Sequence, residues 1–337
     1  MFNMSRGAKT TLILVLVFVI ILGVGVGSWF LLKDRRAKAA ENYIKTGDEF
    51  MEQEDYANAL ICYKKALLFT PRSYTPYYKQ GILAKTTGHF DEAISYLNQS
   101  LNYGSKEIVV HLAMGEVYSL KGETEKAKNS LLNAYRINPQ DDKILYLLAE
   151  NSLRQEETEE AKDYFKQASE VSGKNEYKIY LALLEAFSDP TNSEGLVAGI
   201  NSEVQIKEMN LTDFSKVFIK LKGIENLVSR DVLLYQIFNQ IGLADFGVKG
   251  LERLSVDNAE IRDIWVFLGY GYLKTNKLDE AKKALDKAVE LDPVFAFTHY
   301  LLGKYYDEVG LFAQAKQEYE KAQDLGFSEK DPLSNEG

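Results

Sequence analysis

Side chains that could perform catalysis or bind a metal are few and widely separated in this chain. The 337 residues include three histidines, His89, His111 and His299, and a single cysteine, Cys62. One cysteine can form neither an intramolecular disulfide nor a paired-cysteine metal site. The sequence also lacks an HExxH metalloprotease pattern, a Walker-type glycine loop and a DxDxDG calcium loop. It therefore predicts no catalytic residues, no metal site and no cofactor, and the chain is not expected to be an enzyme.

The charged residues argue against two further kinds of site. Residues 156–160 read EETEE, but they span a predicted turn and helix start, where carboxylates interact favourably with the helix dipole. A solvated helix start therefore explains this run better than a metal site. The whole chain has 40 basic and 49 acidic residues, with a net charge of −9. Without a basic face to neutralise phosphates, nucleic acid is not an expected partner.

The elements that must position any site follow a 34-residue period. Each period places large, small, large and then small, large, small residues at fixed spacing, as in Trp265, Gly269, Tyr272, Ala281, Leu285 and Ala288. The pattern recurs with its first large residue at Tyr43, His111, Leu145, Trp265 and His299. Small residues let two helix backbones approach, and large residues fill the gap between them. One such helix pair cannot bury its own apolar face, so the pairs must stack in an array.

These landmarks resemble the tetratricopeptide repeat (TPR) family, whose 34-residue consensus has the same order of large and small residues. Well-matched repeats start near Ala40, Tyr74, Ile108, Asp142, Arg262 and Ala296, and degenerate repeats start near Glu176 and Val228. The resemblance implies an all-α fold, a right-handed superhelical α-solenoid of helix-turn-helix repeats. It further implies a protein-binding scaffold, although the consensus residues themselves are structural and do not specify a partner.

The period predicts two solenoid segments with a joint between them. Frames counted from the two ends of the chain disagree by 18 residues, about one helix with its turn, and an inserted helix over 211–228 best accounts for the difference. The run SDPTNS at 188–193 is the strongest helix-breaking stretch. The predicted organisation is a tail at 1–10, a transmembrane helix at 11–32, a TPR segment at 33–187, an irregular joint at 188–227, a TPR segment at 228–329 and a tail at 330–337.

The predicted transmembrane helix at 11–32 reads TLILVLVFVIILGVGVGSWFLL and carries no charge. At 1.5 Å per residue it is about 33 Å long, enough to cross a bilayer core. A single-pass membrane protein is therefore expected, with the bilayer as a partner of 11–32. The basic residues that follow the run favour a cytoplasmic repeat domain, although large domains can translocate against such a bias. Since neither Gly nor Pro occurs between Leu31 and Gly47, this helix is expected to continue into the first repeat.

The resemblance places a partner-binding groove on the first helix of each repeat. The groove positions carried over to this chain are Tyr78, Lys85, Glu116, Lys143, Tyr146, Glu150, Arg154, Tyr180, Tyr270, Lys274, Tyr300 and Lys304. Tyrosine offers contact area with a polar tip, which suits the capture of a protein or an extended peptide. Each tyrosine could instead simply pack between repeats.

These features together predict a membrane-anchored interaction scaffold or adaptor. Three alternatives stay open: a non-catalytic accessory subunit of a membrane enzyme or assembly complex, a cryptic enzyme with its site at the 188–227 joint, and self-assembly into a homo-oligomer.

Overall fold

The computed structural model describes residues 31–104, 108–188, 195, 200, 205–207 and 209–327. The chain divides into two compact units, Met1–Asn138 and Pro139–Gly337. The predicted joint at 188–227 therefore falls inside the second unit, and the predicted segments 33–187 and 228–329 do not coincide with the two units.

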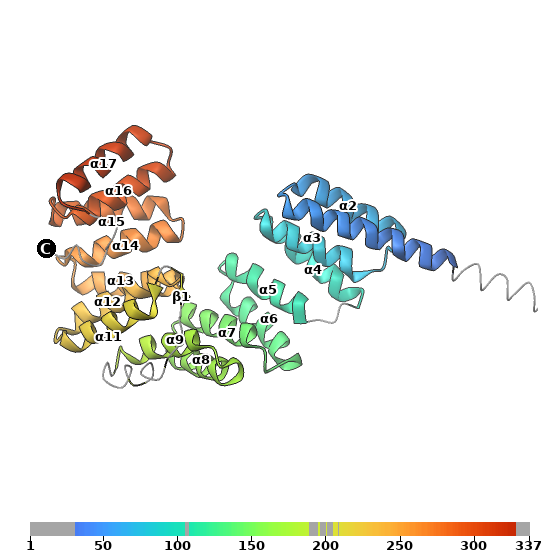
Figure 1. Cartoon of the computed structure of the whole chain (residues 1–337), viewed down its shortest axis with the longest axis horizontal. Helices are drawn as coiled ribbons and strands as arrows, with labels where there is room; N and C mark the ends of the chain where they lie inside the picture. The colour runs from blue at the N-terminus through green and yellow to red at the C-terminus, as the bar shows by residue number, and fades with distance from the viewer. Residues whose placement is uncertain are drawn as a thin grey trace, which may run out of the picture. The chain divides into compact units, whose positions relative to one another are not determined.

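The first unit is a series of antiparallel helix pairs (Figure 1). It contains a helix over residues 31–52, α2 (Tyr56–Phe69), α3 (Tyr74–Thr86), α4 (Phe90–Asn102), α5 (Ile108–Leu120) and α6 (Thr124–Ile137). The turn inside the α3–α4 pair depends on Gly88, whose φ is +77°. The N–H of His89 donates to the carbonyl of Ala84, which ends α3 in a left-handed cap.

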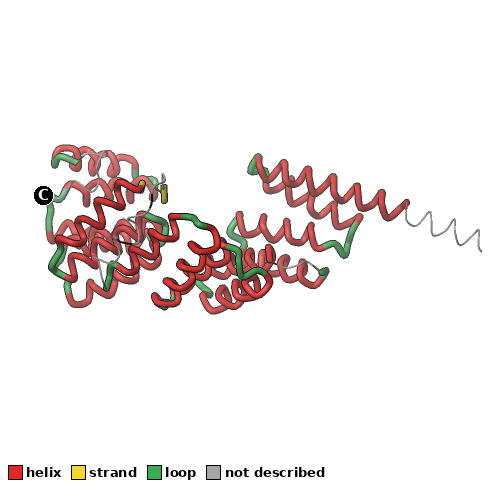
Figure 2. The backbone as a smooth tube through the Cα atoms, turned by 60° about the horizontal axis from the view of Figure 1, so that its bottom comes forward, coloured by secondary structure: helices red, strands yellow, loops and turns green. Residues whose placement is uncertain are grey.

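The second unit contains further helix pairs and one small sheet. Its elements are α7 (Asp142–Arg154), α8 (Thr158–Ser172), α9 (Asn175–Glu185), β1 (Gln205–Ile206), β2 (Met209–Asn210), α11 (Leu211–Gly223), α12 (Leu227–Gln240), α13 (Ala244–Asp257), α14 (Arg262–Lys274), α15 (Leu278–Leu291), α16 (Ala296–Glu308) and α17 (Phe312–Asp324). The antiparallel strands β1 and β2 (Figure 2) are the one departure from the expected all-α fold within the described residues. The predicted helical-repeat architecture is otherwise confirmed.

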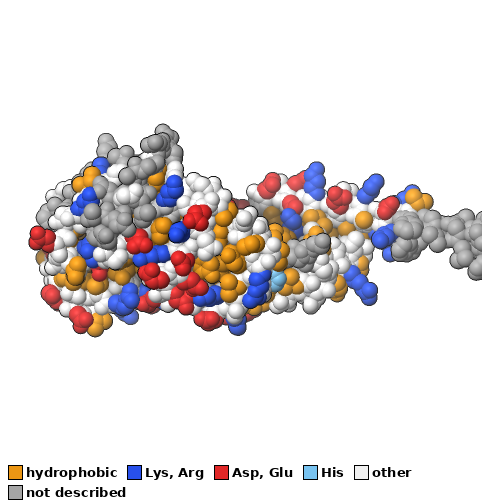
Figure 3. Space-filling view, turned by 90° about the horizontal axis from the view of Figure 1, so that it is seen from below, with side chains coloured by type: hydrophobic (Ala, Val, Ile, Leu, Met, Phe, Trp, Pro, Cys, Tyr) orange, Lys and Arg blue, Asp and Glu red, His pale blue; other side chains and the backbone are white. Residues whose placement is uncertain are grey.

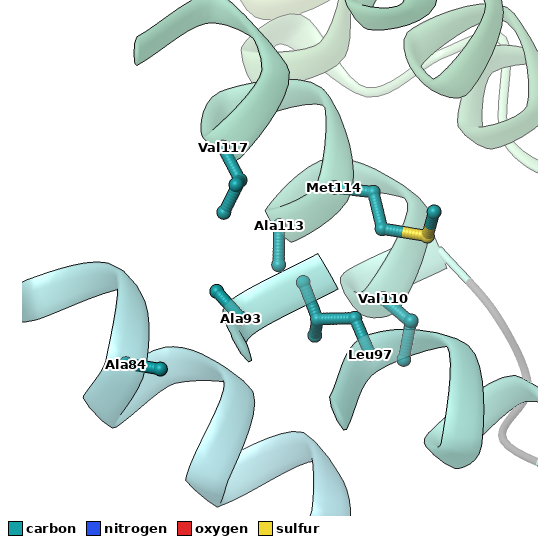
Figure 4. Packing of buried hydrophobic residues seen from close by; sticks show 7 residues of the cluster. All are labelled: Ala84, Ala93, Leu97, Val110, Ala113, Met114 and Val117. Atoms are coloured by element: carbon teal, nitrogen blue, oxygen red, sulfur yellow. The ribbon is translucent and has the colours of Figure 1, made fainter. Parts of the chain in front are cut away.

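The repeat landmarks form the core between paired helices. In the first unit a buried cluster joins α3, α4 and α5 through Ala84, Ala93, Leu97, Val110, Ala113, Met114 and Val117 (Figure 4). Leu97 is fully buried, which is worth about 2 kcal/mol. A Cβ added at Gly81 would lie 2.8 Å from Leu97 Cγ. The small residue of one helix therefore makes room for the large residue of the next, as the sequence period predicts.

The inserted helix ends earlier than the sequence pattern suggests. Leu211–Gly223 forms α11, and Phe214, Val217, Phe218 and Leu221 are buried along one face. The predicted helix continued to residue 228. That end is wrong, because the Asn226 side chain accepts a hydrogen bond from the Ser229 N–H at 3.0 Å and starts α12.

The predicted transmembrane helix lies almost wholly outside the described residues, since only its last two positions, 31 and 32, are described. Residues 31–52 form one continuous helix, and the predicted continuation from 11–30 lies outside the described residues. From residue 31 onward, no described helix has both the length and the apolar character needed to span a membrane.

Asp231 in α12 is expected to weaken the fold at neutral pH. Burial raises the pKa of this carboxyl. Its Oδ1 accepts no hydrogen bond within the described part of the chain, and Arg230 Nε lies 3.7 Å away. Because the folded-state pKa is above the unfolded value, the stabilising contribution is present at low pH and is lost as pH rises through the folded pKa.

We therefore predict that Asp231→Asn raises the free energy of unfolding at pH 7 by up to about 1 kcal/mol and leaves it unchanged at pH 3. Urea denaturation at both pH values measures this. Lower stability of the variant at pH 7 would mean that attraction to Arg230 outweighs desolvation.

Candidate functional site

The groove residues predicted in the first unit pack on or pair with neighbouring repeats. Lys85 on α3 forms an ion pair with Glu116 on α5, and each side chain is less than one quarter exposed. Tyr78 is partly buried and packs against the cluster around Leu97. These three side chains therefore join consecutive repeats.

In the second unit, Tyr146 and Tyr180 belong to an aromatic cluster between α7, α8 and α9. Tyr180 is 6% exposed and stacks on Phe165, with ring centroids 4.9 Å apart. The Tyr146 ring lies 5.9 Å from Tyr180 and 6.2 Å from Phe165. Burial, together with the nearby Glu150, raises the pKa of Tyr146 to about 12. Both tyrosines therefore pack within this aromatic cluster.

Charged groups at the start of α7 extend this cluster. Asp142 accepts a hydrogen bond from the Tyr177 hydroxyl at 2.8 Å and pairs with Lys174 at 2.6 Å. The Lys174 ammonium group lowers the pKa of Asp142. The predicted groove residue Lys143 is exposed beside them.

Arg154 links two helices that are far apart in the sequence. Its guanidinium lies 2.8 Å from Glu150 on the same helix and 3.1 Å from Asp245 on α13. Its backbone carbonyl accepts a hydrogen bond from Lys249 at 2.7 Å, and Arg253 pairs with Glu156 at 2.7 Å. The end of α7 is therefore fixed to α13, and Arg154 and Glu150 are engaged within the fold.

The remaining groove residues form two similar pairs on α14 and α16, which we call the Tyr–Lys ladder: Tyr270, Lys274, Tyr300 and Lys304. Lys274 Nζ lies 5.3 Å from the Tyr270 ring centroid, and Lys304 Nζ lies 5.4 Å from that of Tyr300. Both tyrosines pack against one buried cluster, and both lysines are exposed. The ladder therefore offers positive charge held over aromatic surface.

Phe327, which the sequence reasoning missed, completes the ladder's support. Its ring stacks on Tyr300 with centroids 4.3 Å apart. It is held there by a left-handed helix end at Gly326, where the Phe327 N–H donates to the carbonyl of Ala322 at 2.9 Å. A Gly followed by an apolar residue is typical of this cap, so the dipeptide after the last helix was an available signal.

The ladder can bind an anionic group and an apolar side chain together. Exposed ammonium groups attract carboxylates, and the tyrosine faces contribute contact area. On the face drawn in Figure 3, acidic, basic and hydrophobic side chains are interspersed. Within the described ranges, no group of three or more His, Cys, Asp or Glu could hold a metal ion.

Comparison with known proteins matches five repeats to one family model. The tetratricopeptide repeat model matches residues 74–103, 109–141, 142–175, 263–295 and 298–325. These are five of the six well-matched repeats predicted from the sequence. The model does not match the degenerate repeats near Glu176 and Val228.

Several known proteins share the pattern. A TPR repeat-containing protein of Pseudomonas aeruginosa is 36% identical over 77 residues, which are 22% of this chain and 70% of that protein. A BBSome complex member homologue of Drosophila melanogaster is 22% identical over 269 residues, covering 71% of this chain and 55% of its own length. The chain spans only 13%, 55% and 43% of three curated relatives.

Among solved structures, pilF of Pseudomonas aeruginosa shares 16% identity and a TM-score of 0.44, covering 69% of this chain and 97% of that structure. The helix pairs, their landmark packing, the matched repeats and the bacterial relative agree, and the chain belongs to the tetratricopeptide repeat family.

Proposed function

We propose that this protein is a non-catalytic, membrane-anchored scaffold that binds an acidic segment of a partner protein on the Tyr–Lys ladder. TPR proteins mediate protein–protein interaction, and this family membership supports the binding role. The observation that carries the proposal is the pair of exposed lysines held over Tyr270 and Tyr300 on α14 and α16. An extended segment with carboxylates and one aromatic or aliphatic side chain fits this surface.

The ladder is a better candidate than the other predicted groove residues. Lys85 and Glu116 neutralise each other, Arg154 is shared between two carboxylates, and Tyr180 is buried. By contrast, Lys274 and Lys304 lie on the surface. A partner carboxylate at either exposed lysine would form a charge-assisted contact.

Charge reversal in the ladder should reduce peptide binding. Acidic 12-residue peptides selected from a display library against the full-length protein in detergent provide the probe. We expect Lys274→Glu/Lys304→Glu to weaken their binding about tenfold or more, because two attractive contacts become repulsive. Fluorescence anisotropy measures the dissociation constants.

The matched control is Lys283→Glu/Lys321→Glu, which makes the same charge change at exposed positions on the second helices α15 and α17. We expect this control to bind peptide within about twofold of the wild type. Equal weakening in both variants would show a general charge effect, and unchanged binding in the ladder variant would place the binding surface elsewhere.

The proposed anchor is residues 11–32, and its support is the uncharged apolar run in the sequence. We expect the full-length protein to remain in the membrane pellet after alkaline carbonate extraction. Leu16→Arg/Ile20→Arg should release it, since each arginine at the helix centre costs about 2.5–3.5 kcal/mol. Release of the wild-type protein by carbonate would contradict anchoring. Pellet retention of both forms would indicate attachment through another part of the chain.

A further inference from the structure

A hollow lies at the start of the first described helix, in the first compact unit. One wall is the first turns of the helix over 31–52, and the other is the turn between α2 and α3. We call it the N-terminal hollow, lined by Leu32, Lys33, Arg36, Ala37, Phe69, Thr70, Pro71, Arg72 and Ser73. Its volume is about 710 Å³, within the range of small-molecule sites. In Figure 1 the dark blue helix extends past the end of α2.

The hollow carries positive charge and no carboxylate in its lining. Arg36 and Arg72 are exposed. Neither guanidinium group has an ion-pair or hydrogen-bond partner among the residues described here. Lys33 adds a third cation to the lining. Guanidinium groups bind phosphate oxygens through paired hydrogen bonds, so this charge suits a phosphate group.

Apolar surface adjoins these cations. Leu31, Leu32 and Leu68 are 67%, 55% and 78% exposed, and Phe69 is fixed by stacking on Tyr43 with centroids 5.7 Å apart. Figure 3 shows basic, acidic and hydrophobic side chains together where the described chain meets the grey trace. Exposed leucines beside arginines match an amphiphile, with its phosphate at one end and hydrocarbon at the other.

The position of the hollow along the chain indicates that the amphiphile is a lipid of the bilayer. Leu32 is the last residue of the uncharged run 11–32, and Arg36 follows four residues later on the same helix. At 1.5 Å per residue, Arg36 lies about 6 Å beyond the run. The headgroup layer on each side of a bilayer is about 5–8 Å thick. The cations therefore lie at headgroup depth when the run spans the hydrocarbon core.

We infer that the N-terminal hollow binds the headgroup of an acidic glycerophospholipid from the bilayer that holds the anchor. The lipid phosphate lies between Arg36 and Arg72, and the adjoining acyl chain contacts Leu32 and Phe69. This inference rests on the membrane attachment proposed above. A bound lipid would also fix the first repeat against the membrane surface, because one wall is the turn that ends this repeat and the other is the N-terminal extension of its first helix.

Native mass spectrometry of the full-length protein, released from micelles containing equal phosphatidylglycerol and phosphatidylcholine, tests the inference. We expect the wild type to retain phosphatidylglycerol preferentially. Arg36→Gln/Arg72→Gln should weaken that retention about tenfold or more, as expected when two cations near the membrane surface are removed. The matched control Lys45→Gln/Lys64→Gln removes two exposed lysines outside the lining and should retain the lipid as the wild type does.

Three results would overturn the lipid site: no preference for phosphatidylglycerol in the wild type, equal loss in both double variants, or displacement of the lipid by glycerol 3-phosphate at equal concentration. The last would show a soluble phosphate ligand that makes no use of the acyl contact. Carbonate extraction of the same samples separates this inference from the anchor. If the wild type stays in the pellet without lipid preference, only the hollow's role fails; if it is extracted, the anchor fails.

Discussion

Replacing Gly247 by alanine should destabilise the second compact unit by about 2 kcal/mol. Gly247 on α13 faces α12, and an added Cβ would lie 2.2 Å from Asn239 Oδ1 and 2.6 Å from the backbone carbonyl oxygen of Tyr235. Asn239 is 2% exposed and donates to the carbonyl of Phe267 at 3.1 Å. It cannot move aside without losing that hydrogen bond, and the carbonyl is fixed within α12.

The magnitude follows from two destabilising effects and one stabilising effect. Overpacking of this kind typically costs about 1–3 kcal/mol and sometimes more, and the loss of a buried hydrogen bond adds about 1 kcal/mol. Alanine gains back about 1 kcal/mol in helix propensity over glycine. Urea denaturation of the full-length protein in detergent measures the net change, and hydrogen exchange over α12 and α13 locates it.

The matched control is Gly223→Ala at the end of α11. A Cβ at Gly223 meets nothing within 4 Å, so we expect unchanged or slightly higher stability. A Gly247→Ala protein as stable as the wild type would contradict the close approach of α12 and α13.

The contacts of these glycines show why the packing of some repeats can be predicted from the sequence and that of others cannot. Landmark glycines such as Gly115 and Gly269 lie against Leu131 and Leu285, each 16 residues later. This contact is local in sequence, so a single 34-residue period reveals it. In α12 and α13 the close approach instead involves Gly247 and Asn239. Counted from Val228, Gly247 stands at the small position that Ala281 occupies in the next repeat, but Asn239 is not a consensus position. The sequence therefore identifies Val228 as the start of a repeat but does not predict how α12 and α13 pack together.

The candidate site shows a different limit of sequence reasoning. The residues at the family positions lie on the first helix of each repeat, and cation–aromatic pairs such as Tyr300 with Lys304 lie one helical turn apart. Contacts across the insertion could not be inferred in this way. Asp245 lies 91 residues after Arg154, and no periodic pattern connects them. The sequence therefore predicts Arg154 as a groove residue but does not predict its ion pair with Asp245 on α13.

Reversing the charge of Arg154 should cost about 2 kcal/mol of stability. Arg154→Glu would place a third carboxylate beside Glu150 and Asp245, whose side chains are 23% and 37% exposed. Exposed ion pairs are worth about 0–1 kcal/mol and breaking buried ones costs about 3–5 kcal/mol. This partly buried site lies between these limits, and repulsion adds to the lost attraction.

The charge swap Arg154→Glu/Asp245→Arg tests whether the contact itself is responsible. An arginine at position 245 would face the glutamates at positions 150 and 154, so we expect at least half of the lost stability to return. Urea denaturation of the wild type, both single variants and the swap yields the coupling energy between the two sites.

The same four proteins decide whether Arg154 also contacts a partner. If its only role is to join α7 and α13, Arg154→Glu should lower peptide binding only as far as it unfolds the protein, and the swap should restore binding together with stability. Restored stability without restored binding would return Arg154 to the binding surface, because a partner would then require a cation at that place on α7. If the swap is no more stable than Arg154→Glu alone, the attraction between Arg154 and Asp245 does not hold α7 against α13, and the hydrogen bond from Lys249 to the Arg154 carbonyl is the stronger candidate for that link.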